Sequence, residues 1–68
     1  MITQKIQTEF IRLDALLKLS NVVQSGGQAK WIIQDGNVSV NGEICTQRGK
    51  KIRVGDTVTI GEKTITVE

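Results

Sequence analysis

The sequence contains no histidine, only one cysteine and no long apolar run. Without histidine or a second cysteine there is no plausible zinc-ligand set, and Cys45 has no partner for an intramolecular disulfide. The lack of a long apolar run excludes a membrane span. The N-terminal stretch MITQKIQTEF alternates in polarity and has no apolar centre of signal-peptide length. We therefore expect a cytoplasmic protein with no metal and no membrane association.

The groups that catalysis requires are also scarce. Cys45 lies on an expected strand edge with no base to activate it, and no two carboxylates form a recognisable acid/base pair. No glycine-rich loop is followed by lysine and serine or threonine, so a phosphate cradle for nucleotide hydrolysis is missing. A chain of 68 residues buries only a thin core. These features favour a binding module, and we expect no enzymatic activity, no cofactor and no small-molecule substrate.

The charges that are present are unevenly placed. The net charge of +2 is modest and says little by itself. Most acids lie beside expected helix ends or turns, where carboxylates have structural roles. Six consecutive residues, 48–53, contain four bases and no acid, whereas other bases are scattered over two expected helices. The pattern predicts that one end of the molecule is positive.

Two helices are expected in the first half of the chain. Leu13, Leu16 and Leu17 form an i, i+3, i+4 stripe on a helix from Arg12 to about Ser20. Asp14 suits the positive end of this helix dipole and is expected to pair with Lys18, four residues later. Before this helix, polarity alternates over residues 2–10, which predicts a short peripheral strand.

The second helix is bounded by clear signals. Ser25 is a good N-cap and Gly36 is placed to end the helix in a left-handed conformation. Between them, Ala29, Ile32 and Ile33 form the expected buried stripe. Gly27, Lys30, Trp31 and Gln34 lie together on a second face.

The rest of the chain is typical of short strands. Residues 37–40 alternate, and Asn41-Gly42 predicts a type I′ hairpin turn into residues 43–45. A turn at residues 54–56 precedes two strands, 57–60 and 63–67, which are joined through Gly61-Glu62. We expect an α+β domain in which two helices pack on a small antiparallel sheet.

These residues, taken in order, resemble the S4 RNA-binding domain. The resemblance covers residues 12–60 and implies the family's alpha-L motif fold in a single domain over residues 1–68, like the small stand-alone S4 proteins of bacteria. It is carried by Arg12-Leu13-Asp14, Leu17, Ser25, Gln28-Ala29-Lys30, Ile33, Gly36, Val38, Val40-Asn41-Gly42, Val54-Gly55-Asp56 and Val58.

The resemblance implies an RNA-binding surface formed by the helix pair and the hairpin. The implied partner is ribosomal RNA or another structured RNA, with a role in ribosome assembly or translation and contacts to the ribosome. Gly26-Gly27 departs from the family pattern, in which an arginine often follows the serine, and so removes a charge from the centre of the surface. The implied RNA contacts are Arg12, Ser25, Gln28, Lys30 and Asn41, with Arg48, Lys50 and Lys51 nearby.

Structural interpretations of the same residues stay open. Arg12 can pair with a local acid, and capping alone accounts for Ser25. Asn41 serves the turn and also has an amide that is free for a ligand. Trp31 and Gln34 are candidates for a stacking or partner contact, but for Trp31 we favour packing at the core edge because lone tryptophans in small proteins usually cover the core.

The alternative function is a protein-interaction adaptor of the same fold with only weak RNA affinity. In that case the helix face that carries Trp31 meets a protein partner. A small β-grasp sulfur carrier is excluded because such carriers end in Gly-Gly, whereas this chain ends in Thr66-Val67-Glu68.

Overall fold

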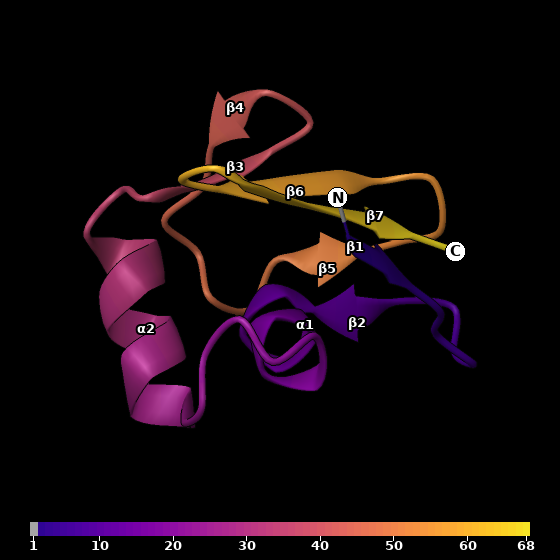
Figure 1. The fold of residues 1–68 in the computed structure, drawn as a ribbon, viewed down its shortest axis with the longest axis horizontal. Coiled ribbons are helices and arrows are strands. Elements are labelled where there is room, and N and C mark those ends of the chain that lie inside the picture. Colours follow the sequence, from indigo (N-terminus) through magenta and orange to yellow (C-terminus); the bar gives the residue numbers. More distant parts are fainter. Residues whose placement is uncertain (1) are drawn as a thin grey trace.

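Two helices lie on the same side of a five-stranded sheet (Figure 1). The computed structural model describes residues 2–68. Neither described helix has the length and apolar character needed to cross a membrane. The elements are β1 (Ile2–Gln4), β2 (Ile11–Arg12), α1 (Leu13–Leu19), α2 (Gly26–Gln34), β3 (Val38–Val40), β4 (Glu43–Ile44), β5 (Lys51–Ile52), β6 (Thr57–Ile60) and β7 (Lys63–Val67).

The sheet is antiparallel except at one edge. Its strand order is β1-β7-β6-β3-β4, and β1 runs parallel to β7. A separate antiparallel pair joins β2 to β5. The predicted α+β architecture of two helices on a small sheet is confirmed, with the parallel β1–β7 pair as an addition that alternation alone does not specify.

The N-terminal strand is shorter than its polarity pattern predicts. Alternation continues to residue 10, but β1 ends at Gln4, which pairs with Val67 near the end of β7. Two further hydrogen bonds continue the pairing: the Glu68 N–H donates to the Gln4 carbonyl and the Ile6 N–H donates to the Glu68 carbonyl, both at 2.9 Å. Because β7 ends there, the next residues have no ladder partner, and the chain turns towards β2.

The core lies between the helices and the sheet. The α1 stripe of Leu13, Leu16 and Leu17 is wholly buried, as predicted. In α2, Ala29 and Ile33 are wholly buried, whereas Ile32 is only partly buried and packs at the margin. From the sheet, Val38, Val58 and Ile65 are also wholly buried in this core. Burial of these side chains supplies most of the driving force for folding.

The local signals for helix and hairpin ends are also confirmed. The Ser25 side chain accepts a hydrogen bond from the Gln28 N–H at 3.1 Å. Gly36 follows α2 with φ of 81°, in the left-handed region. Asn41 and Gly42 have φ of 51° and 88°, as a type I′ turn requires. The β3–β4 hairpin is therefore set by its own turn residues.

Candidate nucleic-acid interface

Residues 45–50 link β4 to β5, and we call this segment the basic loop. It folds back onto the start of α1. After β4 the chain descends past the sheet edge to this helix (Figure 1). There the Leu13 N–H donates to the Lys50 carbonyl at 2.9 Å, and the Asp14 N–H donates to the Arg48 carbonyl at 3.1 Å. Pairing of β2 with β5 then sets the loop beside the residue that precedes α1. We call the four residues brought together here the basic cluster: Arg12, Arg48, Lys50 and Lys51.

Two cations of the basic cluster lie directly opposite each other. Arg12 and Lys51 are partners in the β2–β5 register, an arrangement that repulsion disfavours. Each charge has its own compensation. A guanidinium nitrogen of Arg12 lies 3.2 Å from Asp14 Oδ2, and Lys51 Nζ lies 4.9 Å from the centroid of the Phe10 ring. Phe10 was missed by sequence reasoning, because only the folded chain brings it under Lys51.

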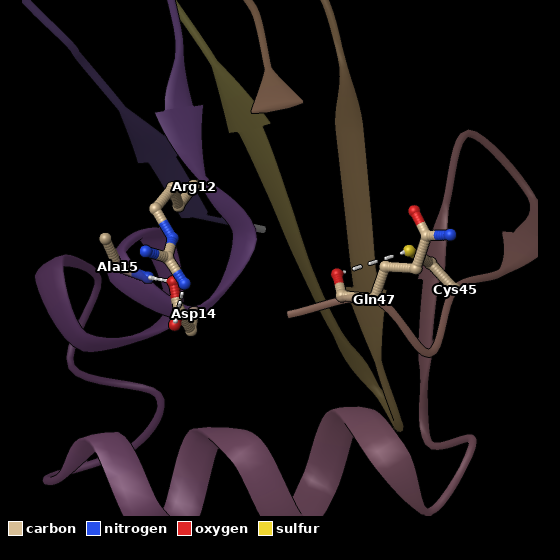
Figure 2. Close-up of polar contacts among 5 residues, drawn as sticks. All are labelled: Arg12, Asp14, Ala15, Cys45 and Gln47. Carbon is tan, nitrogen blue, oxygen red and sulfur yellow. Dashed lines mark hydrogen bonds and ion pairs between the residues drawn. The ribbon is translucent and has the colours of Figure 1, made fainter. Parts of the chain in front are cut away.

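Asp14 has a different partner from the one predicted. Figure 2 shows its carboxylate between the Arg12 guanidinium and the Ala15 backbone N–H. The expected pair with Lys18 is therefore wrong, and the structural interpretation of Arg12 is confirmed: it pairs with a local acid. With 56% of its side chain exposed, Arg12 remains accessible, but part of its charge is offset.

A groove of about 620 Å³ opens beside the basic cluster. One wall is formed by the β3–β4 hairpin and the residues that follow it, including Ile44 and Gln47. The Sγ atom of Cys45 lies 3.7 Å from the Gln47 carbonyl within this wall (Figure 2). The lining of the groove also includes the cationic residues Lys50, Lys51 and Arg53.

Asn41 and Asp56 clasp the hairpin to the turn before β6. The Asn41 Nδ2 donates to Asp56 Oδ1 at 3.1 Å, and the Thr57 N–H donates to Asn41 Oδ1 at 2.9 Å. The prediction that this amide stays free for a ligand is wrong, because both of its polar atoms are engaged. We call this arrangement the Asn41–Asp56 clasp.

Hydrogen bonds from Arg53 and from the Asn41 side chain stabilise the ionised form of Asp56. The Arg53 backbone N–H donates to Asp56 Oδ2 at 2.8 Å. This hydrogen bond is the main cause of a pKa of Asp56 below its usual value, and the Asn41 amide and the charges of Lys50 and Arg53 lower it further against the opposing effect of desolvation. The carboxylate on the groove wall is thus already satisfied.

Three predicted site residues lie apart from the groove, on α2 or at its N-cap. Ser25 caps the helix, and Gln28 Oε1 accepts from the Gln24 N–H at 2.9 Å. These two side chains act in a reciprocal cap like a capping box. Lys30 is exposed on the helix surface. The lining of the groove comes from residues 40–56 and includes none of the three.

Trp31 projects into solvent. Its side chain is 66% exposed, so the expectation that it packs at the core edge is wrong. The reason is geometric: Trp31 lies about 200° around the helix from buried Ala29, and the core side of α2 is already filled by Ala29 and Ile33. Gln34 is also exposed.

Comparison with known proteins identifies the family. The family model described as S4 domain matches residues 4–68. The chain is 51% identical over 55 residues to the probable ribosome maturation protein RlbA of Bacillus subtilis, covering 81% of this chain and 78% of that protein. It is 35% identical over 60 residues to the RQC P-site tRNA stabilizing factor of Halalkalibacterium halodurans, covering 85% and 67%.

A solved structure agrees in fold. The solution structure of YbcJ from E. coli, titled as revealing an alphaL motif involved in RNA-binding, superposes with a TM-score of 0.76 at 35% identity, covering 98% of this chain and 86% of that one. The match of family, relatives and fold confirms the resemblance read from residues 12–60 and extends it over nearly all of the described residues. This chain belongs to the S4 domain family and has its alpha-L fold.

Proposed function

We propose that this protein binds structured RNA, with ribosomal RNA as its main target, and acts in ribosome maturation or translation in the cytoplasm. The observation that carries the proposal is the folding of the basic loop onto α1, which brings the backbone of Arg48, Lys50 and Lys51 beside Arg12 and the start of α1. The ribosome-related names of the relatives support the same class of RNA.

The chemistry of the basic cluster suits a ribose-phosphate backbone. Lysine and arginine attract phosphates with release of counterions. Folded RNA is recognised largely by shape and by backbone contacts, and the basic cluster offers a charged surface with no built-in base-reading set. Arg48, Lys50 and Lys51 are its main phosphate contacts, and Arg12 contributes less because Asp14 already holds part of its charge.

Charge reversal in the basic cluster tests the proposal. The double variant Lys50→Glu/Lys51→Glu should bind a structured ribosomal RNA fragment at least tenfold more weakly, with a log–log salt slope reduced by about one unit for each lost phosphate contact. The measurement is a filter-binding titration at several salt concentrations. The matched control Lys5→Glu/Lys63→Glu makes the same charge change outside the groove lining. Equal losses in both variants would refute the assignment of the site.

The exposed face of α2 favours a second candidate function, a protein-interaction adaptor. Trp31 offers a large uncovered aromatic surface, and tryptophan is enriched at protein interfaces. Its emission reports whether RNA reaches α2, since it is the sole tryptophan. Quenching by RNA would place RNA on α2. The adaptor would be supported by two results together. Trp31 emission would stay unchanged at saturating RNA, and Trp31→Ala would lose binding to a protein partner that is not part of the ribosome.

A further inference from the structure

One wall of the groove carries an uncovered apolar side chain. Ile44 lies on the edge strand β4 and is 70% exposed, and it lines the groove. Val54 is similarly exposed at 62%, but it does not line the groove. Ile44 thus supplies an apolar contact surface within a mainly polar wall.

Two of the cationic side chains that line the groove, Lys50 and Arg53, have no ion-pair partner within the described part of the chain. Among residues 2–68, the one ion pair within 4.0 Å joins Arg12 to Asp14, so the charged groups of Lys50 and Arg53 have no carboxylate partner at that distance. Asp56 nearby is occupied by the Asn41 amide and the Arg53 N–H. Glu43 adjoins Ile44 on β4. We therefore expect a ligand with an anionic end and a flat apolar part to place its anion at Lys50 and Arg53.

The size of the groove limits what enters it. A volume of about 620 Å³ falls within the range of small-ligand sites, roughly 300–1,000 Å³. It is suited to one nucleotide and too small for a paired helix. Unpaired bases that are splayed out of a helix are the features of RNA that proteins read individually.

We infer that the groove receives one unpaired nucleotide of the bound RNA, with its base against Ile44 and its phosphate at Lys50 and Arg53. This inference rests on the proposed function and refines it. The basic cluster holds the neighbouring helical backbone, and the groove selects RNA that carries a bulged or looped-out nucleotide beside a helix.

Two RNA hairpins that differ by a single bulged nucleotide test this inference. Wild-type protein should bind the bulged hairpin about fivefold more tightly than the fully paired one. Ile44→Ala should lose this preference and keep the affinity for the paired hairpin, because it removes the base contact alone. Lys50→Gln should weaken binding to both hairpins. As a second readout, 2-aminopurine at the bulge should change its emission on binding wild-type protein and not on binding Ile44→Ala.

Val54→Ala and Lys63→Gln are the matched controls and should both behave like wild type. Equal wild-type affinity for the two hairpins, or an unchanged preference in Ile44→Ala, would overturn the groove assignment and leave the proposed function intact. Absence of salt-dependent binding to either hairpin would instead refute the proposed function.

Discussion

At the level of single residues, the polar side chains of the predicted site and of the groove differ in whether they have a partner within the fold. Asn41 and Asp56 are engaged with each other, and Ser25 with its own helix. Lys50 and Arg53 keep their charges available on the groove wall. The residues that shape the site are therefore different from those that are free to contact a ligand.

The hydrogen bonds that Asp56 accepts from the Arg53 N–H and the Asn41 amide make the stability depend on pH in the acid range. The pKa of Asp56 is lower in the folded chain than the usual value of about 3.9. Its contribution is therefore fully present above that value and is lost as the pH falls through the folded pKa. We expect Asp56→Asn to flatten the pH dependence of the unfolding free energy below about pH 4, measured by urea denaturation. Glu62→Gln, an exposed turn residue, is the control, and a wild-type slope in Asp56→Asn would contradict the role of the carboxylate.

Removing the other half of the clasp should cost stability at neutral pH. Asn41→Ala loses both side-chain hydrogen bonds and places alanine at a positive φ of 51°. We expect a loss of roughly 1–2 kcal/mol in the free energy of unfolding. Asn37→Ala, which removes only an exposed contact to Asp35, should change it by less than about 0.5 kcal/mol. Equal losses of unfolding free energy in Asn41→Ala and Asn37→Ala would show that the clasp does not stabilise the fold.

At the level of elements, α2 presents two different surfaces. Its inner side packs Ala29 and Ile33 into the core, and its outer side carries Trp31. The first turn is closed by the reciprocal cap of Ser25 and Gln28. This cap occupies the side chains of Ser25 and Gln28, which the family resemblance implied as RNA contacts, whereas Lys30 remains exposed on the helix surface.

Substitution of Ser25 separates the capping role from an RNA-binding role. Ser25→Ala should lower stability by about 1 kcal/mol, seen as a lower melting temperature. RNA affinity measured well below that temperature should stay within about twofold of wild type. Ser25→Thr, which keeps the capping oxygen, should restore the melting temperature. A large loss of affinity in Ser25→Ala at unchanged stability would return this residue to the list of RNA contacts.

At the level of the whole molecule, the location of charge matters more than its total. The net charge is only +2, yet the loop between β4 and β5 concentrates cations beside the start of α1. A weakly basic protein can bind RNA in this way because phosphate contacts depend on the local density of cations.

A charge-swapped variant tests this point directly. Combining Lys50→Glu and Lys51→Glu with Glu62→Lys and Glu68→Lys lowers the charge by four and raises it by four, so the net charge stays at +2. We expect RNA affinity to remain at least tenfold below wild type, as measured by filter binding. Recovery of wild-type affinity would show that binding follows total charge and not the basic cluster.

Local signals were sufficient for the helices, the caps and the hairpin turn. The leucine stripe, Ser25, Gly36 and Asn41-Gly42 act over a few neighbouring residues, so the sequence pattern contains all that determines them. The alternation over residues 2–10 predicted too long a strand, because the length of β1 is limited by a partner at the other end of the chain.

The folded chain alone decided which side chains share a surface. Arg12 meets Lys51, Lys51 meets Phe10, and Asn41 meets Asp56 across long separations in the sequence. A charge pattern shows how many cations lie close together along the chain. Which carboxylate or aromatic ring each cation contacts depends on distances in the folded structure. These spatial distances explain why Asp14 pairs with Arg12 and not with Lys18, and why Trp31 is exposed.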